Sequence, residues 1–151
     1  MYYYKNMKKR KLMVVGPVGS GKSSLISCLN GKGMDAKKTQ SVLYDTLSID
    51  TPGEYLENPC MYKYIIAEAQ SVEYVLFIQD AMQRRCIYPP GFAQSFNRKT
   101  IGVITKVDTE SVEVEHSQKI LQTIGVKGPI LKTSSKTGYG IKELKEYLGI
   151  E

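Results

Sequence analysis

Hydrophobic residues follow two alternating patterns along the chain. Short, nearly continuous apolar runs predict buried parallel strands, over Lys11–Val15, Val42–Tyr44, Thr46–Asp50, Tyr74–Gln79, Thr100–Thr105 and Pro129–Thr133. Stretches with apolar residues three or four positions apart predict helices, over Lys22–Leu29, Met61–Ala69, Glu110–Ile124 and Ile141–Leu148. Such alternation is typical of α/β proteins. We expect a mostly parallel six-stranded sheet with helices on both faces.

The ends of the predicted elements carry their own signals. Gly125 and Gly149 follow two helical patterns directly, where a left-handed helix cap is expected. Residues 80–99 form the least regular part of the chain. Because 20 residues are long for a single loop, we predict a short helix within them, over Phe92–Phe96.

Length and composition predict a single globular domain. The chain has 151 residues, of which 42% are hydrophobic and 24% charged, within the ordinary globular range. Its formal charge is +6, but five of the 21 basic residues and none of the 15 acidic ones lie in residues 1–11. The rest of the chain is therefore nearly neutral, which argues against a nucleic-acid binder. We divide the chain into a basic arm, residues 1–10, and one domain, residues 11–151.

The cysteines and the single histidine suggest neither disulfides nor a metal cluster. Cys28, Cys60 and Cys86 show no paired spacing, which favours a reducing, cytoplasmic compartment. We expect each of them to be a small buried hydrophobic residue. His116 is predicted to lie on a helix surface. No apolar run is long enough to span a membrane, and no secretory signal is predicted.

A phosphate-binding loop follows the first predicted strand. The segment GPVGSGKS, residues 16–23, matches G-x-x-x-x-G-K-[ST] and is followed by a helical pattern. Backbone N–H groups of such a loop surround nucleotide phosphates, and the helix dipole favours the anion. The lysine contacts the β- and γ-phosphates, and the serine hydroxyl binds Mg²⁺. The predicted phosphate-binding residues are Gly16, Val18, Gly19, Ser20, Gly21, Lys22, Ser23 and Ser24.

A second motif, DTPG at residues 50–53, ends the third predicted strand. By itself a D-x-x-G turn is weak evidence, because strands often end in such residues. Beside a phosphate loop, Asp50 is expected to hold Mg²⁺ through a water molecule. The Gly53 N–H is expected to sense the γ-phosphate.

Two further loops have the residues to recognise a purine base. In TKVD, residues 105–108, the carboxylate of Asp108 can accept hydrogen bonds from the N1 and N2 donors of guanine, whereas adenine offers an acceptor at N1 and no amino group at C2. Thr105 and Lys106 belong to the same loop, and the Lys106 stem is expected to lie along base and ribose. The segment Ser134, Ser135 and Lys136 could supply N–H groups to the guanine carbonyl and stack a lysine on the base. GTP and GDP are therefore the expected ligands, with ATP possible.

These four elements, in this order, resemble a small Ras-like GTPase. More narrowly, GPVGSGKSSL, KKTQSV, SIDTPGEYLENP, PPGFAQSFN and IGVITKVD resemble the EutP/PduV family of ethanolamine- and propanediol-utilization proteins, from about Lys11 to Leu148. The resemblance implies a three-layer α/β P-loop domain, nucleotide binding with Mg²⁺, and a bacterial, cytoplasmic setting beside a protein-shelled microcompartment. Some members are described as acetate kinases, others as GTP- or ATP-binding.

The resemblance also assigns catalytic positions and shows departures from them. Lys22, Glu54 and Thr39 take the catalytic positions; Thr39 either completes Mg²⁺ coordination or is a plain loop residue. Glu54 stands where Ras-like enzymes place the glutamine that orients water, so we expect slow hydrolysis. Val18 should obstruct an arginine finger supplied by a partner. Thr105 replaces an asparagine, which removes an amide that ties this loop to the phosphate loop.

Two function classes remain. The first is a slow GTPase or nucleotide switch that controls a partner. The alternative is an ATP-dependent acetate kinase, for which Arg84 and Arg85 are the only arginine pair that could neutralise the transferred phosphoryl group. The base-reading TKVD motif favours the first. A microcompartment shell or an enzyme is the expected partner, docked through the N-terminal arm or the switch regions.

Overall fold

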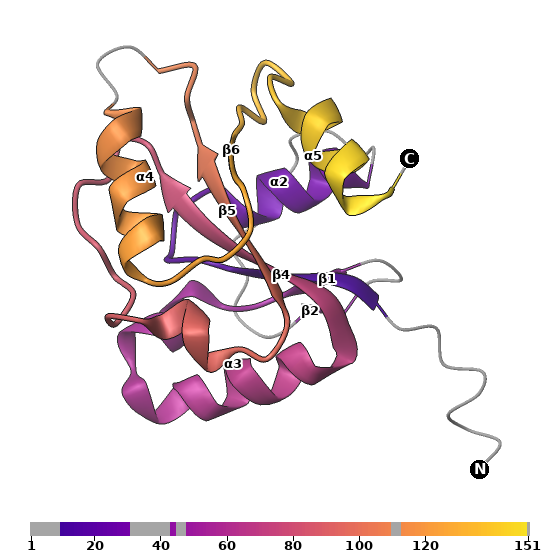
Figure 1. Cartoon of the computed structure of the whole chain (residues 1–151). Helices are drawn as coiled ribbons and strands as arrows, with labels where there is room; N and C mark the ends of the chain where they lie inside the picture. Colours follow the sequence, from indigo (N-terminus) through magenta and orange to yellow (C-terminus); the bar gives the residue numbers. More distant parts are fainter. Residues whose placement is uncertain (1–9, 31–42, 45–47, 110–112, 151) are drawn as a thin grey trace, which may run out of the picture.

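The computed structural model describes residues 10–30, 43–44, 48–109 and 113–150. Its centre is a six-stranded sheet in the order β2-β3-β1-β4-β5-β6 (Figure 1). The strands are β1 (Arg10–Val15), β2 (Leu43–Tyr44), β3 (Ser48–Asp50), β4 (Val72–Asp80), β5 (Lys99–Thr105) and β6 (Ile130–Lys132). Five of these run parallel, and the edge strand β2 pairs antiparallel with β3. The predicted mostly parallel six-stranded sheet is confirmed.

Helices cover both faces of the sheet, as expected (Figure 1). Side chains alternate along β1, so Leu12 and Val14 pack with apolar residues of α2 (Lys22–Leu29) and α5 (Ile141–Leu148). Met13 and Val15 point to the other face and join apolar residues of α3 (Tyr62–Glu68) and α4 (Val114–Thr123). All four β1 side chains are fully buried. Because both faces of the sheet are buried, its strands need apolar residues at successive positions, which explains the continuous apolar runs in the sequence.

Short 3₁₀ helices complete the chain between the longer elements. They are η1 (Gly53–Glu57), η2 (Pro59–Met61), η3 (Ala69–Ser71) and η4 (Phe92–Ser95). The last confirms the short helix predicted between residues 92 and 96. Its Phe92 packs on Phe77 of β4 at a ring-centroid distance of 6.1 Å, which anchors the irregular segment to the core.

Several local predictions can be compared with the structure. Gly125 and Gly149 adopt φ values of +90° and +71°, so both left-handed caps are confirmed. The predicted helix over Glu110–Ile124 begins instead at Val114, because Glu113 has φ −105° and ψ 82°, outside the helical region. Residues 110–112 lie outside the described part of the chain.

The expected burial of the cysteines is wrong for Cys60 and Cys86 and only partly correct for Cys28. Cys60 and Cys86 are exposed, and Cys28 is half-buried. Cys60 lies in the short helix η2, which has no buried residue, and Cys86 lies in the irregular segment after β4; neither carries an apolar periodicity that points a side chain into the core. His116 is on the exposed surface of α4, as predicted. Among the described residues, no helix has the length and apolar character needed to cross a membrane.

Candidate functional site

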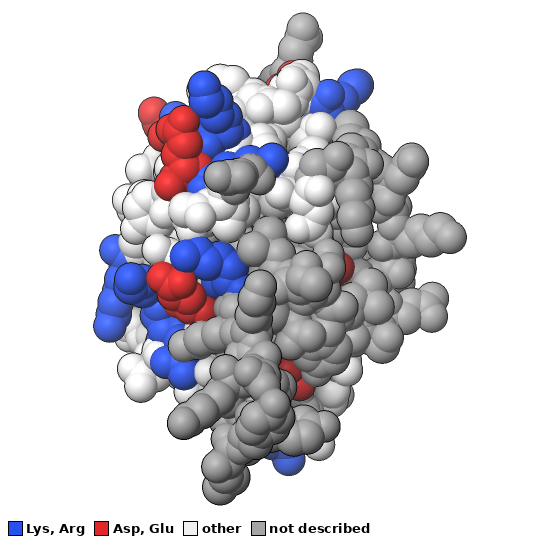
Figure 2. Space-filling view, turned by 90° about the vertical axis from the view of Figure 1, so that its right-hand side faces the viewer, with Lys and Arg blue, Asp and Glu red and all other residues white. Residues whose placement is uncertain are grey.

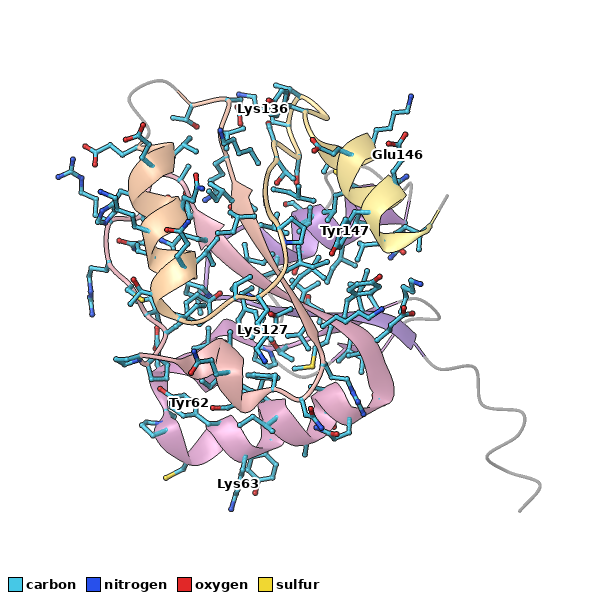
Figure 3. All side chains as sticks on the ribbon, in the orientation of Figure 1. Tyr62, Lys63, Lys127, Lys136, Glu146 and Tyr147 are labelled. Atoms are coloured by element: carbon cyan, nitrogen blue, oxygen red, sulfur yellow. The ribbon has the colours of Figure 1, made fainter. Side chains whose placement is uncertain are left out.

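The motifs meet because parallel strands end at one edge of the sheet. Strands β1, β3 and β5 end at Val15, Asp50 and Thr105, immediately before or within the phosphate loop, the DTPG turn and the TKVD loop. Ligands of open α/β sheets bind outside this carboxyl edge. The loop carrying Lys136 reaches the same end of the molecule (Figure 3). The fold therefore assembles one site from four separate segments.

The phosphate loop has the backbone conformation that its glycines permit. Gly19 and Gly21 have φ values of +77° and +93°, in the left-handed region. A Cβ atom on Gly16 would lie 2.8 Å from the Ser20 Oγ and 2.9 Å from the Cβ of Ile78, closer than real side chains allow. The loop thus folds tightly over the end of β4 and leads directly into α2.

Lys22, the first residue of α2, is the buried cation of this loop. It is 6% exposed, and its Nζ donates a hydrogen bond to the Pro17 carbonyl oxygen at 3.4 Å. Burial lowers the pKa of the Lys22 ammonium from its ordinary 10.5, while the charges of Asp50 and Glu54 oppose that shift. A cation held in partial desolvation interacts strongly with an anion that enters the loop.

Ser23 and Asp50, both predicted metal ligands, lie against each other. The Ser23 Oγ donates to Asp50 Oδ2 at 3.0 Å, and Asp50 is 5% exposed. The next residue, Thr51, donates from Oγ1 to the Val14 carbonyl at 2.9 Å and so fixes the strand end to β1. A hydroxyl beside a carboxylate is a hard oxygen donor set that fits Mg²⁺ shared with a phosphate. Thr39 lies outside the described residues.

The DTPG turn rests directly on the phosphate loop. A Cβ atom on Gly53 would lie 2.3 Å from the Val18 N and 2.7 Å from the Pro17 carbonyl carbon, so only glycine fits there. Glu54 follows in η1, and its charge acts on Lys22. The Val18 side chain is 40% exposed beside this contact. The turn and the phosphate loop form one continuous surface.

Thr105 corrects one expectation about the base-reading loop. Its Oγ1 donates to the Ser20 carbonyl at 2.6 Å, and the residue is 2% exposed. A Cβ atom on Gly21 would lie 3.6 Å from that Oγ1, at ordinary contact distance, so the Thr105 side chain packs against the phosphate loop. The tie that we expected the missing asparagine to remove is therefore made by a threonine hydroxyl.

Lys106 makes a second tie between the same two loops. Its Nζ donates to the Gly19 carbonyl at 2.8 Å and pairs with Asp80 Oδ2 at 2.8 Å. Among the described residues it is the one non-glycine residue with positive φ, at 62°. Asp80 is not among the predicted site residues, although it directly follows the buried strand predicted over Tyr74–Gln79.

Asp108 is oriented by a buried serine. The Ser134 Oγ donates to Asp108 Oδ1 at 2.7 Å and accepts from the Thr137 N–H at 3.2 Å, and Ser134 is fully buried. A cavity of about 260 Å³ adjoins this pair. Its lining residues are Gly21, Ser24, Thr105, Lys106, Asp108, Thr109, Ser135 and Lys136. The structure thus brings both predicted base-reading loops and the phosphate loop around one cavity.

Comparison with known proteins assigns the family. Residues 9–150 match the family PduV-EutP, described as ethanolamine utilisation - propanediol utilisation. The chain belongs to this family. The propanediol utilization protein PduV of Citrobacter freundii is 37% identical over 102 residues, covering 68% of each chain. The "Probable acetate kinase EutP" proteins of Salmonella typhimurium and Escherichia coli K12 are 33% and 31% identical over 141 residues, covering 92% of this chain and 89% of theirs.

A solved structure confirms the fold class. The bacterial selenocysteine-specific elongation factor EF-Sec aligns with 95% of this PduV-EutP chain at a TM-score of 0.67 and 24% sequence identity. The chain spans 28% of that elongation factor's length. The likeness shows that the fold is the α/β fold of a domain within that factor.

The arginine pair considered for phosphoryl transfer lies apart from the cavity. Arg84 forms an ion pair with Glu113, just before α4, and its carbonyl oxygen is 2.8 Å from the His116 Nε2. Both Arg84 and Arg85 are exposed. Neither lines the cavity beside Asp108.

Proposed function

We propose that this PduV-EutP chain binds a guanine nucleotide with Mg²⁺ and hydrolyses GTP slowly. The observation that carries the proposal is the cavity beside the phosphate loop, in which Ser134 holds the Asp108 carboxylate. A carboxylate fixed at a cavity wall pairs with the two donors of guanine, while adenine would leave it desolvated against an acceptor.

The phosphate side of the site is built for a charged ligand. Lys22 stands buried at the start of α2, where loop N–H groups and the helix end favour phosphate oxygens. Ser23 and Asp50 would hold Mg²⁺, which on binding would neutralise part of the phosphate charge. Ser20 and Gly19 carry the carbonyls that bind the base-reading loop, so that the phosphate and base parts of the site are joined.

Slow hydrolysis follows from two residues beside the phosphate loop. Glu54 brings a carboxylate near Lys22, and a carboxylate repels the γ-phosphate that a glutamine would tolerate. Val18 presents a side chain, 40% exposed, where an arginine finger from a partner would have to pass. The GTP-bound form would then be long-lived, and a partner would recognise it.

An acetate kinase is the second candidate function. Three relatives carry the name "Probable acetate kinase EutP". Transfer to a small acceptor is helped by arginines on the transferred group, yet Arg84 is exposed and already paired with Glu113. We therefore place nucleotide switching first.

We place this activity in ethanolamine or propanediol utilisation, the setting that the family description names. A cytoplasmic role beside a microcompartment, with a shell or enzyme partner at the N-terminal arm or the switch regions, belongs to the same proposal. Residues 1–9 of that arm lie outside the described residues, and Arg10 is the first residue of β1.

A nucleotide panel tests the proposal. Fluorescent GTP, GDP and ATP analogues are titrated with Mg²⁺, and products are then analysed with and without acetate. We expect tighter binding of guanine nucleotides and slow, acetate-independent release of phosphate. Lys22→Ala should weaken binding by about a hundredfold or more, because it removes the buried cation that faces the phosphates.

The matched control is Lys127→Ala. Lys127 is exposed and lies well apart from Lys136 (Figure 3), so nucleotide affinity should not change. If Lys22→Ala binds nucleotide as tightly as the unaltered protein, the proposed phosphate site is wrong. Tight ATP binding with formation of acetyl phosphate would show that the protein is an acetate kinase and not a nucleotide switch.

A further inference from the structure

The last residue of β4 carries a carboxylate that none of the four motifs includes. We propose that Asp80 is a positioning residue: by holding Lys106 it locks the base-reading loop to the phosphate loop, and the lifetime of the bound nucleotide depends on it. The inference rests on the proposed nucleotide binding and adds a residue that controls release.

Both oxygens of the Asp80 carboxylate have hydrogen-bond partners. Oδ2 pairs with Lys106 Nζ at 2.8 Å, and Oδ1 accepts from the Met82 N–H at 2.8 Å. The Asp80 side chain is 14% exposed. Two bonds from one carboxylate at the end of a central strand fix its rotamer, so the charge is presented to Lys106 from a rigid position.

Lys106 needs such an anchor because its backbone is strained. A non-glycine residue at φ 62° costs of the order of 1 kcal/mol. Its Nζ donates at the same time to the Gly19 carbonyl at 2.8 Å. The contacts therefore run without a break from the end of β4, through one ammonium group, to the phosphate loop.

The charges around this ammonium explain why the carboxylate matters. The TKVD loop contains a second carboxylate, Asp108, which the proposed function reserves for guanine. The Asp80 carboxylate compensates the positive charge of the Lys106 ammonium, whose side chain is 40% exposed. Without that charge, Lys106 is drawn to Asp108 and competes with the base. Loss of Asp80 should loosen both the loop contact and the base contact.

The test measures nucleotide release from the full chain. Asp80→Asn keeps the shape and an oxygen acceptor for the Met82 N–H but removes the charge that pairs with Lys106. We expect fluorescent GDP to dissociate about tenfold faster, the effect of losing one charged hydrogen bond. Stopped-flow displacement by excess GDP gives the rate.

A double-mutant cycle separates positioning from a general structural role. In a Lys106→Met background, Asp80→Asn should change the GDP dissociation rate less than twofold, because the partner of the charge is already absent. A purely structural carboxylate would act equally in both backgrounds. The matched control is Glu73→Gln, which neutralises the carboxylate at the other end of β4, paired with Lys11 at 2.9 Å; GDP release should stay unchanged.

Each outcome decides the inference. Faster release in Asp80→Asn that disappears in the Lys106→Met background supports it. Unchanged release in Asp80→Asn, or an equal acceleration in both backgrounds, overturns it while leaving nucleotide binding intact. If the unaltered protein binds no guanine nucleotide, the proposed function fails and this inference fails with it.

Discussion

Strand β4 carries a carboxylate paired with a lysine near each of its ends, and the two pairs differ in what surrounds them. At the amino end Glu73 pairs with Lys11 at 2.9 Å; at the carboxyl end Asp80 pairs with Lys106 at 2.8 Å. The Glu73 side chain is 40% exposed, against 14% for Asp80. The exposures of the two lysines run the other way, 28% for Lys11 and 40% for Lys106, so the two pairs differ in which partner is sheltered from solvent.

The neighbours of the two pairs also differ. Lys11 lies over the ring of Tyr74, 5.4 Å from its centroid, on the surface of the domain. On the face shown in Figure 2, basic and acidic side chains lie side by side. At the carboxyl end, by contrast, Gln79, Thr105 and Ser20 are all at most 2% exposed. An exposed pair contributes little, whereas buried polar contacts are costly to break.

Tyr88→Phe is expected to give the largest loss of stability among the changes that test this contrast. The buried Tyr88 hydroxyl lies 2.5 Å from the Ile78 carbonyl oxygen and 3.0 Å from the Val15 carbonyl oxygen, and its one proton is shared between these two acceptors. Its removal should lower the free energy of unfolding by about 2 kcal/mol. Urea denaturation measures this, and Tyr64→Phe, at a tyrosine 52% exposed, is the control.

Tyr88→Phe should also change how the free energy of unfolding depends on pH in the alkaline range. Burial raises the pKa of the Tyr88 phenol well above its ordinary 10.0. Below pH 10 the phenol is protonated in both states, so its contribution is complete; above pH 10 the unfolded chain ionises first and stability falls. Unaltered protein should lose more stability between pH 9 and 11 than Tyr88→Phe. Parallel curves would contradict a buried, neutral phenol.

Thr105→Val comes next, because it removes one hydrogen bond while keeping the side-chain volume. The Ser20 carbonyl loses its donor at 2.6 Å, which should cost about 1 kcal/mol of stability and speed GDP release about fivefold. Thr105→Ser retains the hydroxyl and should restore the rate. If serine behaves like valine, packing of the methyl group, and not the hydroxyl, joins the loops.

Glu73→Gln should have the smallest effect. Exposed ion pairs contribute between zero and about 1 kcal/mol, and Glu73 also lies 3.9 Å from Lys99 without burial of either side chain. Thermal denaturation should give a free energy of unfolding within about 0.5 kcal/mol of that of the unaltered protein. A loss as large as that of Tyr88→Phe would show that the amino end of β4 is not the weakly coupled end.

Much of the candidate site could be predicted from the sequence because its motifs are contiguous. Eight consecutive residues, 16–23, specify the phosphate loop, and Asp108 lies three residues beyond the end of β5. The hydrogen bond from Thr105 to Ser20 was missed because these residues are 85 positions apart, and a family pattern with asparagine does not report how close the two loops lie. Exposure of Cys60 and Cys86 was missed because a single-turn helix and an irregular segment carry no periodicity that reports burial.

The sequence by itself determined the succession of strands and helices along the chain and the loops at the strand ends, and it supplied the residues that we propose for phosphate, Mg²⁺ and base. Apolar runs and contiguous motifs are local, and local patterns can be read directly. Only the tertiary structure joined Lys106 to Gly19, 87 positions away, and to Asp80, 26 positions away. Such contacts depend on strand order and on ångström-scale packing, which no neighbouring residues encode.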